Sequence, residues 1–292
     1  MKTIQQSYPS LAQALGVPEV YLKREDQHKY GSHKGRSIPP MIKKYLKEDG
    51  LTNFVLSSSG NVALAAIQAI QAHNRNNPTK LKLTIFVGMH INPYKLKILI
   101  NTIEDANIRL AQVERPKQTA FQMDKTGQAK LIRQATDDLA LIGYEELAQE
   151  LSKIPNLQAI FIPTSSGTTA QGIGEAFQKL KKSVQIHVVQ TTSCHRIAEE
   201  FDTAENDEQS VADALIDQTG QRKDKVIKII KETSGSGWII TNQHIKEAIN
   251  LVKDTCNVAV STNGSLSIAG LKKAVEKGWQ FKGAIVCLVT GI

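Results

Sequence analysis

Cysteine, aromatic residues and long apolar runs are all scarce in this sequence of 292 residues. The three cysteines, Cys194, Cys256 and Cys287, are odd in number and far apart, which indicates neither a disulfide framework nor a zinc site and fits a reducing compartment. No stretch approaches the ~20 apolar residues of a membrane span, and the first residues lead into no apolar run typical of a secretory signal. We therefore expect a soluble cytoplasmic protein with no bound metal and no membrane partner.

Acidic residues are also in deficit, with 28 Asp and Glu against 36 Lys and Arg, a net charge of +8. A basic balance suits nucleic acid or a small phosphorylated ligand. Aromatic residues make up only 5% of the chain, too few for a protein that works by stacking bases. Nucleic-acid binding is therefore a remote alternative, and we expect no nucleic-acid partner.

Short β-branched runs alternate with helix-length segments along nearly the whole chain. This alternation predicts parallel sheets covered by helices on both faces, an α/β fold, and the length suits roughly two domains. The expected strands are Val20–Lys23, Asn53–Leu56, Leu83–Val87, Ile108–Val113, Ala159–Ile162, Ile186–Gln190, Val258–Ser261 and Ala284–Val289. The expected helices are Val62–His73, Pro93–Ala106, Gly143–Lys153, Thr169–Lys181, Lys225–Lys231, Thr241–Thr255 and Leu266–Lys277.

The first loop that could carry chemistry is Gly31-Ser32-His33-Lys34-Gly35-Arg36, at a junction between a loop and a helix. Desolvation and neighbouring cations in such a place would lower the pKa of Lys34 and free its amine as a nucleophile. The loop alone does not distinguish this role from that of an ordinary surface lysine. His33 is a weaker candidate, because a lone histidine is more often a structural hydrogen-bonding group.

Two further loops are suited to binding anions. Ser57-Ser58-Ser59-Gly60-Asn61 lies between an expected strand and helix, where hydroxyls and backbone N–H groups can bind a carboxylate or phosphate. Simple helix capping would need one serine rather than three. Thr164-Ser165-Ser166-Gly167-Thr168-Thr169 repeats this arrangement and predicts a phosphate site, although the dinucleotide and P-loop patterns are both absent. We expect Gly172 and Gly174, in the next helix, to allow close packing on the sheet.

Together, a nucleophilic lysine and two anion-binding loops suit a phosphorylated aldehyde cofactor held as a Schiff base, with an amino-acid carboxylate opposite. At these residues the chain resembles the pyridoxal-phosphate enzymes of the tryptophan synthase β, threonine synthase and threonine dehydratase superfamily, of fold type II. Tyr21-Leu22-Lys23-Arg24-Glu25-Asp26 and Gly31-Ser32-His33-Lys34 resemble the segment that ends in the Schiff-base lysine. Val289-Thr290-Gly291 is similar to the threonine synthase segment whose threonine faces the pyridine nitrogen.

The resemblance implies a role for each site residue. It makes Lys34 the catalytic and cofactor-binding lysine and Thr290 the partner of the ring nitrogen. The loop of Ser57, Ser58, Ser59, Gly60 and Asn61 would bind the substrate carboxylate, with Asn61 also hydrogen-bonded to the phenolic oxygen of the cofactor. The phosphate of pyridoxal 5'-phosphate would be bound by Ser165, Ser166, Gly167, Thr168 and Thr169.

The resemblance also implies two open, mostly parallel sheet domains with the cofactor site between them. Residues 40–142 would form a smaller α/β domain inserted into a larger cofactor-binding domain of residues 1–39 and 143–292. We expect a homodimer that acts on a small amino acid.

The function indicated is a lyase or synthase that performs elimination or replacement on an amino acid. Val289-Thr290-Gly291 and the basic surplus favour chemistry like that of threonine synthase. Serine or threonine ammonia-lyase (dehydratase) is the next alternative, and a reaction like that of tryptophan synthase β is the third. Gly35 and Ser37 replace the acidic residue and glycine that commonly flank the arginine after the lysine in this family. A cofactor-binding protein with lost or regulatory activity is therefore a separate alternative.

Overall fold

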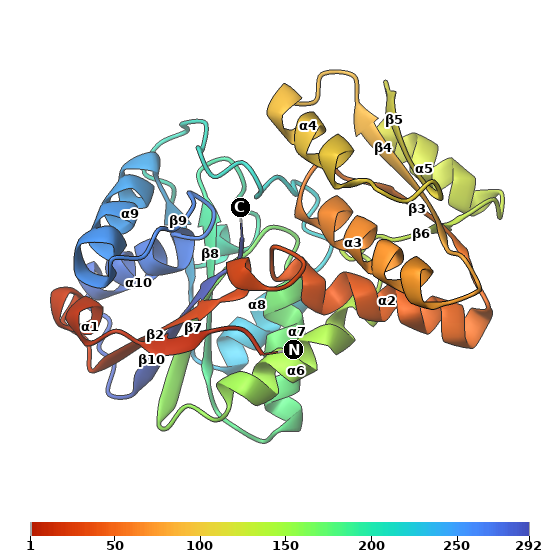
Figure 1. Cartoon of the computed structure of the whole chain (residues 1–292). Coiled ribbons are helices and arrows are strands. Elements are labelled where there is room, and N and C mark those ends of the chain that lie inside the picture. The colour runs from red at the N-terminus through yellow and green to blue at the C-terminus, as the bar shows by residue number, and fades with distance from the viewer. Residues whose placement is uncertain (1, 292) are drawn as a thin grey trace. The chain divides into compact units, whose positions relative to one another are not determined.

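The computed structural model describes residues 2–291. The chain forms two compact units, one made of Met1–His28 with Tyr144–Ile292 and the other of Lys29–Gly143. We refer to them as the first and the second unit. Each contains its own mostly parallel sheet with helices (Figure 1), so the expected α/β fold with two open sheets is confirmed.

The sheet of the first unit has six strands in the order β1-β2-β10-β7-β8-β9. All neighbours pair in parallel except β1, which is antiparallel to β2. At the centre, Cys287 of β10 pairs with Leu22 of β2 on one side and Phe161 of β7 on the other. The strands are β1 (Gln5–Ser7), β2 (Glu19–Arg24), β7 (Leu157–Pro163), β8 (Gln185–Thr191), β9 (Gly237–Ile240) and β10 (Ala284–Val289).

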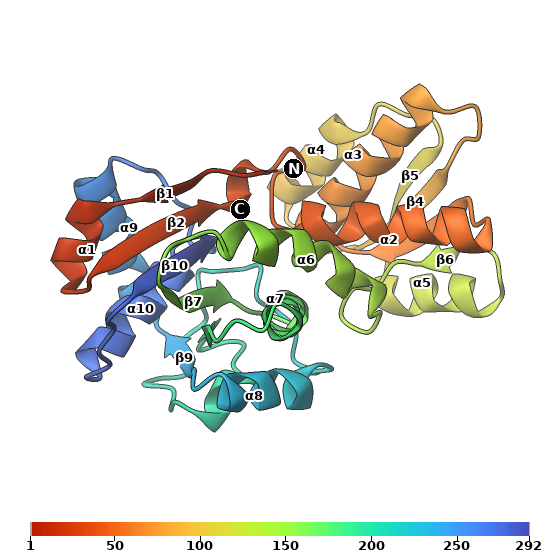
Figure 2. The ribbon, with the colours of Figure 1, turned by 90° about the horizontal axis from the view of Figure 1, so that it is seen from below.

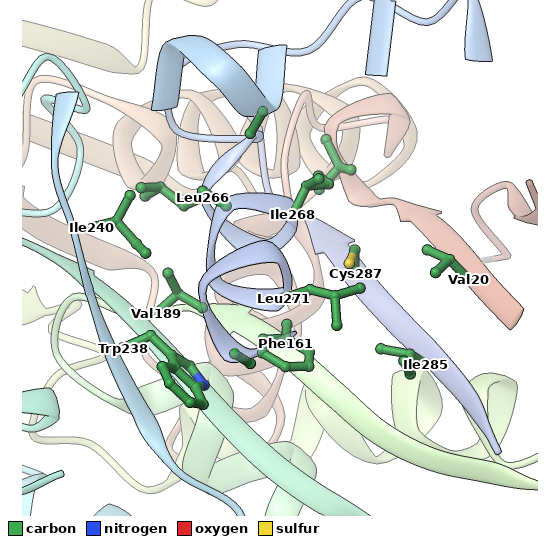
Figure 3. Close-up of a cluster of buried hydrophobic side chains, with 14 of the residues drawn as sticks. Val20, Phe161, Val189, Trp238, Ile240, Leu266, Ile268, Leu271, Ile285 and Cys287 are labelled. Atoms are coloured by element: carbon green, nitrogen blue, oxygen red, sulfur yellow. The ribbon is translucent and has the colours of Figure 1, made fainter. Parts of the chain in front are cut away.

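Helices cover both faces of this sheet because its central strand is apolar on both sides. Along β10, Ile285 and Cys287 belong to one hydrophobic cluster and Val286 and Leu288 to another. The first cluster includes α10, whose leucines and isoleucine lie over the strands in Figure 3. In Figure 2, α7 is seen along its axis between α6 and α8. The helices are α1 (Pro9–Leu15), α6 (Leu139–Leu151), α7 (Thr168–Lys179), α8 (Lys223–Glu232), α9 (Asn242–Cys256) and α10 (Leu266–Glu276), with short 3-10 turns η1 (Glu25–Gln27) and η2 (Ala198–Glu200).

The sheet of the second unit has four parallel strands in the order β5-β4-β3-β6. Helices α2 and α3 pack against each other, and their apolar side chains share one core with β3 and β4. A smaller cluster under α5 covers the other face. The elements are α2 (Lys34–Asp49), β3 (Asn53–Ser57), α3 (Asn61–Asn76), β4 (Lys82–Gly88), α4 (Pro93–Thr102), β5 (Ile108–Val113), α5 (Pro116–Lys125) and β6 (Lys130–Leu131).

Two expectations about local structure differ from what is observed. Val258–Ser261 is not a strand; Val258 and Val260 instead pack against the core of the first unit without pairing to a neighbour. Gly172 and Gly174 do allow close packing, but against helices rather than the sheet. A Cβ at Gly172 would lie 2.8 Å from the Tyr144 ring, and one at Gly174 would lie 2.4 Å from Ile229.

The expected domain boundary after residue 39 also differs from the observed division after His28. The reason is α2, whose buried residues Ile38, Met41 and Ile42 belong to the core of the second unit. At the other boundary, the expected division between residues 142 and 143 lies one residue before the observed one. Within residues 2–291, no helix is both long and apolar enough to cross a membrane.

Candidate active site

Lys34 is the first residue of α2, in the second unit. Its side chain is partly buried, and the two residues before it, Ser32 and His33, are buried. Burial lowers the pKa of the Lys34 amine to about 8. An amine with this pKa is about half neutral at pH 8, whereas an ordinary lysine with a pKa near 10.4 is almost fully protonated there. Lys34 is therefore suited to act as a nucleophile or base near neutral pH.

The first turn of α2 is held in place by groups far away in the sequence. Ser37 donates a hydrogen bond from its hydroxyl to Oε1 of Gln134, at 3.0 Å. Gly143 approaches the same turn so closely that a Cβ there would lie 1.6 Å from the carbonyl oxygen of Arg36. Only glycine fits such a contact. The backbone that carries Lys34 is thus fixed by Gln134 and Gly143, and the sequence alone pointed to neither.

The loop Ser57–Asn61 connects β3 to α3, which begins at Asn61. All five residues are partly exposed. Ser58 accepts a hydrogen bond from the backbone N–H of Gly60, at 3.3 Å, and no side chain caps the helix. The serines therefore do not serve as an ordinary N-cap. The uncapped end of a helix offers N–H groups and a positive dipole to an anion such as a carboxylate.

Lys34 and this loop are both part of the second unit. They begin α2 and α3, which pack side by side and start at the same end of the unit in Figure 1. The structure therefore brings a lysine with a lowered pKa and a candidate carboxylate site to one end of a helix pair.

The loop Thr164–Thr169 lies in the first unit, between β7 and α7. Gly167 precedes the helix with φ of +93°, a conformation that favours glycine. A Cβ there would lie 2.9 Å from Cγ2 of Val226 and 3.1 Å from Cβ of Arg222. Since no side chain caps α7, its first N–H groups are suited to bind a phosphate.

The hydroxyl groups of this loop are engaged in holding the loop itself. Ser165 Oγ accepts hydrogen bonds from the backbone N–H groups of Ile216 and Asp217, both at 3.1 Å. The hydroxyls of Ser166 and Thr168 lie 3.0 Å apart, and the Thr169 hydroxyl donates to the Tyr144 hydroxyl at 3.0 Å. An anion would therefore be bound mainly by backbone N–H groups, while the hydroxyl groups stabilise the loop through hydrogen bonds within the protein.

Gln190 also stabilises the loop Thr164–Thr169, a role that the sequence did not indicate. Its side chain is fully buried on β8. The amide group donates to the carbonyl oxygen of Thr164 at 3.1 Å, while Oε1 accepts from the backbone N–H groups of Ile197 and Ala198, both at 2.8 Å. This pattern ties the start of the loop to the next strand of the sheet.

Thr290 directly follows β10 in the first unit and is 4% exposed. Because β10 and β7 are parallel neighbours, Thr290 and the loop Thr164–Thr169 both follow carboxyl ends of strands at the same edge of the sheet. Binding sites of open α/β sheets are built at this edge. Next to it, Ser261 donates to the carbonyl oxygen of Gly291 at 2.7 Å and accepts from Gly264 N–H at 3.0 Å.

The candidate residues thus form two sets, one in each unit. Lys34 and Ser57–Asn61 belong to the second unit, and Ser165–Thr169 and Thr290 to the first. Across residues 2–291, no group of three or more His, Cys, Asp or Glu is arranged to hold a metal ion.

The chain is similar to known proteins over nearly all of its length. A "Threonine dehydratase" of Nicotiana attenuata is 22% identical over 98% of this chain, which spans 47% of that protein. The "L-threonine dehydratase catabolic TdcB" of Staphylococcus aureus is also 22% identical, over 96% of this chain and 81% of its own. Among solved structures, maize serine racemase matches with a TM-score of 0.82 and 19% identity, covering 100% of this chain and 88% of the racemase.

The chain spans about half the length of the Nicotiana relative, so its similarity to that protein concerns only part of it. A family model described as "Pyridoxal-phosphate dependent enzyme" matches residues 2–291. The match extends over both units and over all of the candidate residues. The chain therefore belongs to the pyridoxal-phosphate dependent enzymes, and pyridoxal 5'-phosphate is its cofactor.

Proposed function

We propose that this enzyme removes water from a small hydroxy amino acid, with Lys34 as the cofactor-binding and proton-transferring residue. The observation that carries the proposal is the lowered pKa of Lys34, to about 8, at the start of α2. The names of the relatives matched over nearly all of the chain, threonine dehydratases, support dehydration as the reaction. The substrate class would then be L-serine or L-threonine.

The residues present fit the phosphate of the cofactor. Gly167 turns the chain into α7 with a φ of +93°, and the uncapped start of α7 supplies backbone donors. A phosphate group carries about −1.5 to −2 charges near pH 7, which the helix dipole favours. We therefore assign phosphate binding to Ser165, Ser166, Gly167, Thr168 and Thr169, mainly through N–H groups.

The other residues bind the substrate and move its proton. Bound pyridoxal phosphate supplies an electron sink that acidifies the α-carbon of an amino acid. The neutral amine of Lys34 can then accept the α-proton at Nζ. The carboxylate of the substrate would be bound by backbone N–H groups and hydroxyls of Ser57–Asn61, at the start of α3. We assign Asn61 a second contact, with the phenolic oxygen of the cofactor.

A second candidate function is a replacement reaction like that of threonine synthase. It is favoured by Thr290, a buried residue at the end of β10. A hydroxyl facing the ring nitrogen would not force that nitrogen to be protonated, which suits elimination and replacement better than transamination. We propose a homodimer as the assembly, which sedimentation of the purified protein tests.

The experiment that tests the proposal measures release of a 2-oxo acid from a panel of amino acids. We expect turnover of L-serine or L-threonine. Phosphate release from O-phosphohomoserine would instead favour the second candidate, and racemisation alone would contradict both. A reaction of serine with indole would indicate a function like that of tryptophan synthase β. Cofactor binding without any turnover would favour a regulatory protein.

The lowered pKa of Lys34 leads to a prediction that does not need the cofactor. Chemical acetylation of the cofactor-free protein, followed by peptide mass spectrometry, reports the neutral fraction of each lysine. We expect the rate at Lys34 to rise about tenfold per pH unit up to pH 8 and then to level off, because neutral amine accumulates only up to its pKa. The curve for an ordinary exposed lysine rises to about pH 10, so a half-point near pH 10 for Lys34 would contradict its lowered pKa.

The phosphate loop leads to a prediction about two glycines that both face α8. We expect Gly167→Ala to weaken the binding of pyridoxal phosphate at least tenfold, because the substitution strains a φ of +93° and displaces the loop. Gly174→Ala should lower the melting temperature by crowding Ile229, yet leave the Kd of the cofactor unchanged. Fluorescence titration measures both constants, and equal Kd values for the two variants would place the phosphate elsewhere.

A further inference from the structure

Arg222 is a buried arginine beside the phosphate loop, and the functional assignment above gives it no role. It immediately precedes α8 and is 4% exposed. Its Cβ would be 3.1 Å from a Cβ built on Gly167, so the two backbones approach closely. Arginine is almost never buried unless it is paired, and the hydrogen bond from Arg222 to Gln171 connects it to α7.

A chain of hydrogen bonds fixes Arg222 to the first turns of α7. Its Nη1 donates to Oε1 of Gln171, at 2.8 Å. The amide nitrogen of Gln171 in turn donates to Oε1 of Glu175, at 2.7 Å. Because one end of the Gln171 amide donates to a carboxylate, the other end must present its oxygen, which suits the guanidinium group. Gln171 is fully buried, so this arrangement holds the start of α7 and Arg222 together.

The positive charge of Arg222 lies near the first turns of α7, because its Nη1 donates to Gln171. The N-terminus of a helix carries the equivalent of about +0.5 charge, which stabilises anions and opposes cations. A guanidinium group stays protonated at all ordinary pH values, and burial weakens its screening by salt. A phosphate dianion bound at the start of α7 would therefore be attracted by the Arg222 guanidinium group as well as by the helix dipole.

We propose that Arg222 is a positioning residue for the phosphate of the cofactor. It holds Gly167 and the first turns of α7 in place through Gln171, and its positive charge raises the affinity for the phosphate group. This inference rests on the proposed role of Ser165–Thr169 as the phosphate loop. It adds to that role a residue that immediately precedes α8, 53 positions beyond the end of the loop (222 minus 169).

The test compares two cofactors that differ only in the phosphate, pyridoxal phosphate and pyridoxal. Both are titrated into the full chain after removal of cofactor, and fluorescence gives each Kd. We expect Arg222→Met to weaken pyridoxal phosphate about 10- to 100-fold while the Kd of pyridoxal stays within about twofold. Arg222→Lys, which keeps the charge but lacks the planar guanidinium group, should fall between Arg222→Met and the parent.

Lys223→Met is the matched control, because it removes the same charge from the adjacent residue, which pairs with Glu199 at the surface. It should change neither Kd by more than about twofold. Equal weakening of both cofactors by Arg222→Met would reduce Arg222 to a structural residue, and no weakening would also overturn the proposal. If Arg222→Met does not fold, Arg222→Lys decides by the same comparison. A parent protein that binds pyridoxal as tightly as pyridoxal phosphate would instead contradict the phosphate loop itself.

Discussion

Lys34→Ala is expected to leave no cofactor that borohydride can attach to the protein and to lower turnover by about 10³-fold or more. The amine of Lys34 is the only group to which we assign both cofactor attachment and transfer of the α-proton, and proton transfer by a positioned group alone contributes about 10²- to 10⁴-fold. Absorbance of the reduced protein measures the attachment, and release of 2-oxo acid measures the turnover.

Lys43→Ala is the matched control, because Lys43 is exposed on the same helix. It should keep both the attached cofactor and the activity of the parent. A Lys34→Ala variant that still turns over substrate at the parental rate would contradict the assignment. Loss of both readouts in the Lys43 variant would show instead that α2 tolerates no substitution.

Gly143→Ala is expected to destabilise the protein by at least about 3 kcal/mol. The added Cβ would lie 1.6 Å from the carbonyl oxygen of Arg36, far inside contact distance, and overpacking of well-packed sites costs about 1–3 kcal/mol or more. Chain movement that relieves the overlap must displace the first turn of α2, which carries Lys34. Urea unfolding measures the free energy, and acetylation of Lys34 reports the displacement as a higher half-point in pH.

Gly88→Ala is the control for this substitution. Gly88 ends β4 in the same unit, and a Cβ there would meet nothing within 4 Å. Its stability should stay within about 1 kcal/mol of the parent. A Gly143→Ala variant as stable as Gly88→Ala would contradict the close approach of Gly143 to the first turn of α2.

Much of the fold could be predicted because several of its strands are short apolar runs that the local sequence reveals. The apolar run Ala284–Val289 and the run Ile108–Val113 agree with β10 and β5 residue for residue. β1, β6 and β9 were not predicted, since two to four residues carry too little pattern. Val258–Ser261 has the composition of a strand and is not one, because pairing depends on a neighbouring strand that no local pattern reports.

The residues of the candidate site divide in the same way. Some can be identified from their neighbours in the sequence, and others only from contacts between segments that are far apart in the chain. The loops at Lys34, Ser57 and Ser165 could be chosen as candidates from the sequence, because each combines a few residues with a junction between elements. Gly143, Gln190 and Arg222 could not, because each acts on a segment 25 or more residues away in the chain, as in the hydrogen bond from Gln190 to Ser165. The engagement of the Ser165 hydroxyl with the N–H groups of Ile216 and Asp217 is likewise visible only in three dimensions.

The most direct test of the central claim is to find which residue carries the cofactor. The protein loaded with pyridoxal phosphate is reduced with borohydride, digested and sequenced by mass spectrometry. The account predicts one modified peptide, with the added mass on Lys34 and none on Lys23, Lys29 or Lys43. Stoichiometric modification of another lysine, with Lys34 unmodified, would contradict it.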